Sequence, residues 1–275
     1  MEQATGPELF GSSVVERREP SIMKSIGQAG RVIFALSMAA FGVQYVIYGA
    51  FKSGIGPPWA VGASLWSYAG GLLLIAAGAG LVNERAGRTC ALVLGIGLFV
   101  YDLIYFLPRS VADPSSGDVR TGVFEILTMS GAALSIAGAL SRGNETARLW
   151  IIVGRAFFGV SMIVFGIDHF LYASFVASLA PDWIPGHLFW TYFTAVGFVA
   201  GGIGIGVNFR SRLSGTALGL MFFLWVAVLH APRVALASNN ANEWTSMFVA
   251  LAMCGASCVF VTREPVKLLR TDNVD

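Results

Sequence analysis

The chain has 275 residues, of which 55% are hydrophobic and only 12% are charged, and its formal net charge is +2. Soluble domains carry roughly twice this share of charged residues, so a water-soluble fold of this size could not bury so much apolar surface. The composition therefore excludes an ordinary soluble domain and indicates that lipid is the main solvent of the chain. No stretch is basic enough to resemble a nucleic-acid-binding arm, so we expect no nucleic acid among its partners.

The first 28 residues are polar, and the first long apolar run begins near Arg31. This run is too long for the core of a signal peptide and has no convincing small-residue cleavage site, so we expect residues 1–28 to form a disordered cytoplasmic tail. At the other end of the chain, residues 263–275 are predicted to form a cytoplasmic C-terminal tail.

Between the two tails lie eight apolar runs of about 20 residues, the length of helix that crosses a bilayer. They fall near 30–51, 61–83, 89–108, 121–140, 152–175, 187–208, 213–232 and 244–262. Helices are expected because an open sheet leaves backbone groups unsatisfied in lipid, and the alternating strands of a membrane barrel are absent. The sequence therefore predicts an all-α integral membrane protein with eight transmembrane helices.

The chain aligns with itself, without a gap, when residue 30 is placed on residue 154. Rare residue types match in this register: Pro57 with Pro181, Trp59 with Trp183, Trp66 with Trp190, Arg88 with Arg212, and Pro108-Arg109 with Pro232-Arg233. Chance does not match Trp, Pro and Arg together, so we predict a tandem duplication of a four-helix unit, at residues 29–141 and 150–262. Because each unit crosses the membrane an even number of times, the units are expected to be parallel repeats rather than the inverted repeats of many transporters.

Basic residues are unequally divided between the two sets of loops. One set holds Arg17, Arg18, Lys24, Arg31, Arg85, Arg88, Arg142, Arg148, Arg155, Arg210, Arg212, Arg263, Lys267 and Arg270. The other set holds only Lys52, Arg109, Arg120 and Arg233. Because cytoplasmic loops carry the excess of Lys and Arg, we predict that both termini are cytoplasmic.

Small residues within the apolar runs indicate how the helices pack. Glycines that would let helix backbones approach closely are Gly78, Gly80, Gly201, Gly202, Gly204, Gly206, Gly215 and Gly219. The cysteines Cys90, Cys254 and Cys258 also lie within apolar runs, where free cysteines usually serve as small packing residues. A disulfide framework is therefore not expected.

Ionisable residues inside a membrane are costly, so their positions mark candidate sites. With the predicted topology, every histidine and every intramembrane acid lies in the outer half of the bilayer or at its outer face. The first unit carries the acids Asp102 and Glu125, and valines stand at the equivalent positions 226 and 249 of the second unit. The two units therefore differ most where chemistry is expected.

The second unit has its own set of polar residues at this level. Asp168, His169, His187 and His230 stand where the first unit has Gln44, Tyr45, Ala63 and Phe106. Our hypothesis is a ligand site in which His169 and His230 come from neighbouring helices and contact the ligand, Asp168 tunes the proton on His169, and Arg233 supplies charge at the outer mouth. Two facing imidazoles could bracket a quinone or, as a weaker alternative, ligate a haem iron. We predict no other metal site, and no nucleophile triad is visible.

Less specific interpretations of the same residues remain open. His187 and His230 could be interfacial residues with one wet edge. Arg109 and Arg233 could be structural anchors or partners of the intramembrane acids, and the tryptophans near the loops are typical of interfacial anchors.

Several of these residues form short motifs. The second unit has Gly166 shortly before His169-Phe170, then a Pro-x-Trp-x-Pro loop over 181–185, Trp190-x-Tyr192, and the glycine-rich stretch 201–204. It thereby resembles the DoxX-like membrane proteins, which are four-helix units with such a His-Phe pair late in helix 1, such a loop, and a glycine-rich helix 2. The first unit shows a weaker copy, with Gln44-Tyr45 in place of His-Phe.

The resemblance implies a role near respiratory or thiol redox chemistry, since some DoxX-like proteins are linked to thiosulfate:quinone oxidoreduction and others to membrane oxidoreductase complexes. The resemblance therefore implies an accessory or quinone-linked subunit of a redox system in a bacterial inner or plasma membrane, with other subunits of that complex as partners. Two alternatives remain: a small-molecule transporter whose vestibule is the outer polar cluster, and a structural or assembly protein without a ligand. Whether the chain is itself an enzyme is left open.

Overall fold

The computed structural model describes residues 21–48, 63–83, 85–141 and 145–262. All regular secondary structure in these ranges is helical, and seven helices are long and apolar enough to cross a membrane. The predicted class is confirmed at this level: the chain is an all-α membrane protein. Several predicted features, among them Lys52, Trp59, Arg142 and most of both tails, lie outside the described residues.

The helices follow one another in two series. The first series is α1 (Ser21–Tyr48), α2 (Ala63–Val82), α3 (Gly87–Tyr101), the π-helical turn η1 (Asp102–Phe106), α4 (Leu107–Ala112) and α5 (Gly117–Ala139). The second is α6 (Glu145–Leu171), α7 (Ala173–Ser178), α8 (His187–Gly206), α9 (Ser211–Trp225), the π-helical turn η2 (Val226–His230), α10 (Ala231–Leu236) and α11 (Ala241–Val259). The starts of α1, α2, α3, η1 and α4 recur 124 positions later, at the starts of α6, α8, α9, η2 and α10.

Two elements differ from the sequence-based expectation. α1 begins at Ser21, so residues 21–28, expected in the tail, are helical. α11 forms where the eighth apolar run was expected, but it is not among the seven spans. The reason is its polar first turn, which contains Asn242 and Glu243 and lowers the mean hydropathy of a short helix.

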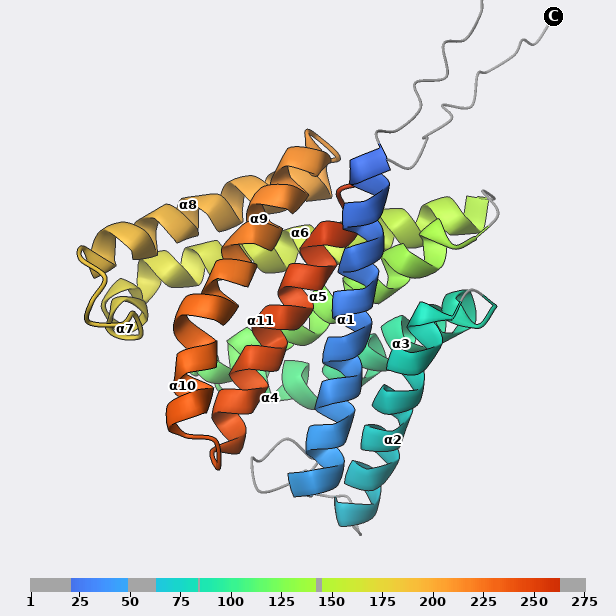
Figure 1. The fold of residues 1–275 in the computed structure, drawn as a ribbon, viewed down its shortest axis with the longest axis horizontal. Helices are drawn as coiled ribbons and strands as arrows, with labels where there is room; N and C mark the ends of the chain where they lie inside the picture. Colours follow the sequence, from blue (N-terminus) through green and yellow to red (C-terminus); the bar gives the residue numbers. More distant parts are fainter. Residues whose placement is uncertain (1–20, 49–62, 84, 142–144, 263–275) are drawn as a thin grey trace, which may run out of the picture.

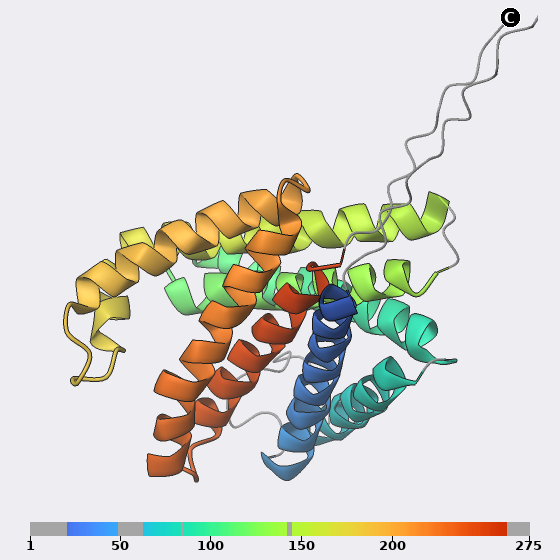
Figure 2. The ribbon, with the colours of Figure 1, turned by 45° about the horizontal axis from the view of Figure 1, so that its top comes forward.

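The helices form one bundle, and the last helix of each series, α5 or α11, lies at its centre. α1 packs against α2 and α11, and α6 packs against α5 and α8. α3 packs on α5, α9 packs on α11, and α5 contacts α11. Figures 1 and 2 show α6 and α8 side by side, at a steep angle to α1 and α2. The first helix of each series therefore packs against the last helix of the other, and the two predicted units are interleaved.

Glycine pairs make these crossings between the series close. A Cβ atom at Gly255 of α11 would lie 2.7 Å from the carbonyl oxygen of Gly30 in α1. At the equivalent crossing, a Cβ atom at Gly131 of α5 would lie 2.6 Å from the carbonyl oxygen of Gly154 in α6. The predicted packing role of glycines is also confirmed at Gly202, where a Cβ would lie 2.7 Å from the Gly159 carbonyl.

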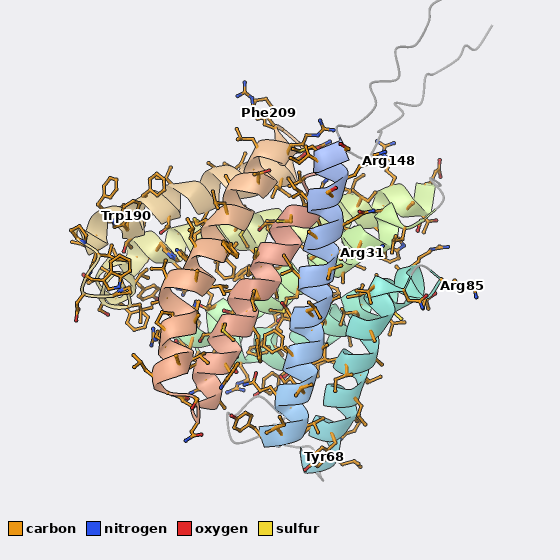
Figure 3. The ribbon with its side chains drawn as sticks, in the orientation of Figure 1. Arg31, Tyr68, Arg85, Arg148, Trp190 and Phe209 are labelled. Carbon is orange, nitrogen blue, oxygen red and sulfur yellow. The ribbon has the colours of Figure 1, made fainter. Side chains whose placement is uncertain are left out.

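The bundle has two chemically different ends. In Figure 3, Arg31, Arg85 and Arg148 lie on the right-hand side of the bundle, which we call the arginine-rich end, whereas Trp190 lies at the left end of α8 and Tyr68 at the lower end of α2. Residues near both limits of the described chain meet at the arginine-rich end, since a Cβ at Gly27 would lie 2.6 Å from the side chain of Thr262. The other end, which we call the opposite end, holds the predicted site residues.

Candidate functional site

The predicted site residues come from several helices at the opposite end. Asp168 and His169 lie in the last turn of α6, His187 begins α8, His230 ends η2, Arg233 lies in α10, Asp102 begins η1, and Glu125 lies in α5. They do not form one cluster but three groups, around His169, around Arg233 and around Asp102. Among the described residues, no group of three His, Cys, Asp or Glu side chains has the arrangement of a metal site.

His169 lies in a cluster of aromatic rings between α6, α8 and α9. Its ring is stacked on Trp225, with the ring planes 8° apart, and its centroid is 5.0 Å from that of Phe198. The Nδ1 atom lies 2.8 Å from the carbonyl oxygen of Phe165. A carbonyl oxygen can only accept, so Nδ1 carries a proton, and in the neutral ring Nε2 then carries the lone pair.

Asp168 forms an ion pair with Arg120 of α5. Its Oδ1 atom lies 2.7 Å from Nη2 of Arg120, and Nε of Arg120 lies 3.3 Å from Oδ2. This two-pronged ion pair joins α6 to α5, and the guanidinium also lies over the ring of Tyr172. The hydrogen bond of His169 Nδ1 goes to the Phe165 carbonyl, whereas the Asp168 carboxylate binds Arg120.

The first series has a comparable polar tie at the matching place. Nε2 of Gln44, the residue that aligns with Asp168, donates to the carbonyl oxygen of Ala241 at 2.8 Å and to Oγ1 of Thr245 at 2.6 Å. This pair of hydrogen bonds joins α1 to α11 as the ion pair joins α6 to α5. The side chains at positions 44 and 168 therefore both form polar bonds between the two series.

Arg233 and His230 form a second group. Nε of Arg233 lies 3.1 Å from Oε2 of Glu243, and Nη2 lies 3.3 Å from Oε1, which joins α10 to α11. Nδ1 of His230 is buried and has no hydrogen-bond partner in the described ranges. No ring contact or hydrogen bond connects His230 directly with His169 in this part of the chain, and the ring of His169 contacts Phe198 and Trp225 instead.

His187 holds a loop rather than facing the other histidines. Its Nε2 atom donates to the carbonyl oxygen of Pro181 at 3.1 Å. Gly186, just before it, has φ of 73°, a left-handed conformation that glycine adopts without strain. The bond ties the loop of the Pro-x-Trp-x-Pro motif to the start of α8.

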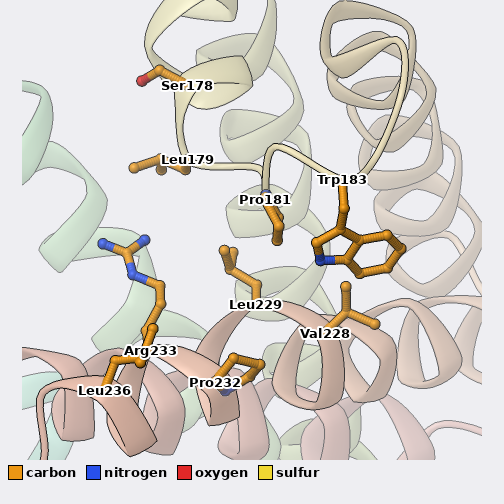
Figure 4. A pocket seen from close by; sticks show the side chains of 9 residues that line it. All are labelled: Ser178, Leu179, Pro181, Trp183, Val228, Leu229, Pro232, Arg233 and Leu236. Carbon is orange, nitrogen blue, oxygen red and sulfur yellow. The ribbon is translucent and has the colours of Figure 1, made fainter.

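This loop covers a cavity of about 460 Å³, shown in Figure 4. Its lining comes from the end of α7, the loop, η2 and α10: Ser178, Leu179, Pro181, Trp183, Val228, Leu229, Pro232, Arg233 and Leu236. Arg233 is the only charged residue among them. Figure 4 places its guanidinium at one end of the cavity and the Trp183 ring at the other. Apolar walls with one fixed polar group are typical of sites for small amphipathic molecules.

Asp102 and Glu125 form the third group. Asp102 is the first residue of η1, its exposed fraction is 3%, and its Oδ1 atom has no hydrogen-bond partner within the described chain. Glu125 is half-buried on α5, which packs against η1.

Sequence reasoning missed the importance of Arg120. A signal was present in the sequence. Arg109, Arg120 and Arg233 are the described basic residues in the set of loops that is poor in Lys and Arg. A cation at this level of the membrane is costly unless it has a partner. Each of the three does have one: Asp168 for Arg120, Glu243 for Arg233, and the hydroxyl group and ring of Tyr105 for Arg109.

With this geometry in hand, the chain can be compared with known proteins. No protein-family model matches it, and neither the curated proteins nor the solved structures show a match.

Proposed function

We propose that this protein is a DoxX-like, quinone-linked subunit of a membrane redox system and that the quinone head group occupies the cavity lined by Arg233 and Trp183. The observation that carries this proposal is the cavity itself, with apolar walls and a single guanidinium. A quinone head group is a flat ring with two carbonyl acceptors and an apolar tail. It therefore needs apolar walls, a donor for a carbonyl oxygen, and a position that lipid can reach.

Arg233 supplies the donor. Its Nε and Nη2 atoms bind Glu243, and Nη1 has no hydrogen-bond partner in the described ranges. Glu243 thus fixes the guanidinium plane and leaves N–H groups for a ligand, a geometry that favours a carbonyl or an anionic oxygen. The Trp183 ring, at the other end of the cavity, is exposed and offers an apolar face to the ligand ring.

His230 is the imidazole that we assign to the ligand. It belongs to the same π-helical turn as Val228 and Leu229, which line the cavity, and its buried Nδ1 lacks a partner among the described residues. His169 has its ring held by Phe165, Phe198 and Trp225, and we assign it a positioning role at α9, the helix that leads into η2. A partner subunit of the redox system would exchange electrons with the bound quinone.

The proposal includes eight membrane spans, a tandem duplication and cytoplasmic termini in a bacterial inner membrane. The recurrence of helix starts 124 positions apart supports the duplication. The contact of Gly27 with Thr262 at the arginine-rich end supports an even number of spans, with α11 as the eighth. The excess of basic residues at that end supports its cytoplasmic location.

Replacing Arg233 by glutamine tests the assignment. We expect a short-chain quinone to quench the tryptophan fluorescence of the purified protein with saturation, and the dissociation constant to rise about tenfold in Arg233→Gln, because a charge-assisted hydrogen bond is lost. Arg148→Gln, which changes an exposed arginine at the arginine-rich end, is the matched control and should bind as the unaltered protein does. Absence of saturable quenching, or equal weakening by both substitutions, would refute the quinone site.

A further inference from the structure

The first series contains an intramembrane acid that the proposed quinone site does not use. Asp102 lies in the membrane-spanning segment Gly87–Ala112, and its side chain is almost completely removed from solvent and lipid, with 3% exposed. Oδ1 has no donor within hydrogen-bond distance in the described chain. A carboxylate in such a place is costly, because burial within the membrane removes the hydration that stabilises its charge.

The backbone does not need this carboxyl group. η1 closes with the N–H of Leu107 donating to the carbonyl oxygen of Asp102, and η2 closes in the same way, from Ala231 to Val226. The second series thus forms the same π-helical turn with valine at the equivalent position. Valine would also avoid the cost of burial, so the acid is not explained by the local fold.

A second acid lies at the same depth on the neighbouring helix. α3 and α5 run antiparallel, since Oγ of Ser130 donates to the carbonyl oxygen of Gly95 at 2.8 Å and a Cβ at Gly122 would lie 2.5 Å from the Phe106 ring. Asp102 and Glu125 both fall between these two contacts. The second series has Val249 in place of Glu125, so both acids are particular to the first series.

The other ionisable groups around this place come from the same helix and from α1 and α5. They are Tyr101, Tyr105 and Arg109 beside Asp102, Tyr45 of α1, which interacts electrostatically with Tyr101 and Tyr105, and Asp118 and Arg120 near the start of α5. Arg109 binds the hydroxyl group of Tyr105 and lies over its ring, and Arg120 binds Asp168.

We propose that Asp102 and Glu125 form an intramembrane proton-binding site of the first series, separate from the quinone cavity of the second. Each carboxylate takes up one proton to become a neutral carboxylic acid and releases the same proton, with no other reactant. The neutral acid removes the cost of an isolated charge in the membrane and adds a hydrogen-bond donor to this polar group. The duplicated scaffold then carries two different sites, one in each series.

A hydrophobic carbodiimide tests the proposal, because it reacts with protonated carboxyl groups in apolar surroundings and leaves a stable N-acylurea that mass spectrometry detects. In the full-length protein we expect the adduct on the peptide that contains Asp102, with Glu125 as the second position. A water-soluble carbodiimide should not label Asp102, whereas it should label Asp113, which is exposed before α5. Asp102→Asn should remove the adduct from its peptide.

Asp102→Val gives a second measurement, since the second series shows that valine fits the same turn. Infrared spectra should lose part of the carbonyl band of protonated carboxylic acids in this variant, while gel filtration in detergent stays unchanged. Asp113→Asn is the matched control and should leave the band intact. The proposal is overturned if Asp102 reacts only with the water-soluble reagent, or if neither the adduct nor the band is observed.

Discussion

Replacing Gly255 by alanine is expected to lower the free energy of unfolding in detergent by about 2 to 3 kcal/mol, at the upper end of the usual cost of overpacking. The added methyl group would lie 2.5 Å from the backbone nitrogen of Phe34 and 2.7 Å from the carbonyl oxygen of Gly30. Both neighbours are backbone atoms of α1, so no side-chain rotation relieves the contact. α1 and α11 must separate, and packing along the whole crossing weakens.

The equivalent substitution and a matched control sharpen this expectation. Gly131→Ala should have a similar effect, because its methyl group would lie 2.6 Å from the Gly154 carbonyl oxygen and 2.9 Å from Cβ of Phe157. Gly97→Ala changes a helical glycine with nothing within 4 Å of the new atom, and it should leave stability unchanged or raise it by about 0.5 to 1 kcal/mol. The midpoint of thermal unfolding of the three variants measures the difference. Equal losses in all three would refute the close crossings.

These crossings explain why the two series depend on each other for stability. Each first helix completes its packing on the last helix of the other series, and α5 and α11 contribute core residues such as Met129 and Met253. A change in one series is therefore transmitted to the packing of the other. The two proposed sites, by contrast, each belong to one series: the cavity is lined by residues of the second series, and Asp102 and Glu125 belong to the first.

The positions of the helices could be read from the sequence because each apolar run has the length that lipid requires. The runs near 187–208 and 121–140 correspond closely to α8 and α5. The start of α1 was predicted about nine residues too late, since hydropathy detects only the apolar part of a helix. Lys24 and Gln28 are compatible with a helix but not with a long stay in lipid, so they lie in its first turns.

The pairing of the helices could not be predicted, for a physical reason. α2 is apolar all round, and only 22% of its span is buried, so core-facing and lipid-facing residues have the same character. The partner of Asp168 was missed for a related reason, because Arg120 precedes it by 48 positions and no spacing rule connects them. The packing role of the glycines was easier to predict, since close backbone contact is nearly the only use of glycine in such helices.

The two π-helical turns were also missed, although the sequence contains their cause. Pro108 and Pro232 are the second residues of α4 and α10, the helices that directly follow η1 and η2. A proline inside a helix has no N–H group and its ring collides with the carbonyl four residues earlier. A π-helical turn just before the proline widens the backbone there and accommodates the ring. As a result, η1 places Asp102 in the core, and η2 places His230 beside the cavity-lining residues.

Removing the ion pair between Arg120 and Asp168 should show how strongly the two series are fastened at the opposite end. The side chains are 22% and 14% exposed, so the pair is neither fully buried nor freely hydrated. We expect Arg120→Ala to cost about 1 to 3 kcal/mol, less than in a dry core, because it leaves the Asp168 carboxylate mostly buried without its counter-charge. Asp168→Ala should cost less than Arg120→Ala if the Arg120 cation can reach solvent. The double variant should cost less than the sum of the single variants, with a coupling energy of about 1 to 2 kcal/mol in thermal or denaturant unfolding.

The same double-mutant cycle on Arg233 and Glu243 is the control. Arg233 is 40% exposed, so the coupling energy of this pair should be smaller and should fall further with added salt. Strict additivity at Arg120 and Asp168 would mean that the ion pair does not hold the crossing of α5 and α6, which would then depend on close packing at glycines such as Gly131, Gly138 and Gly154.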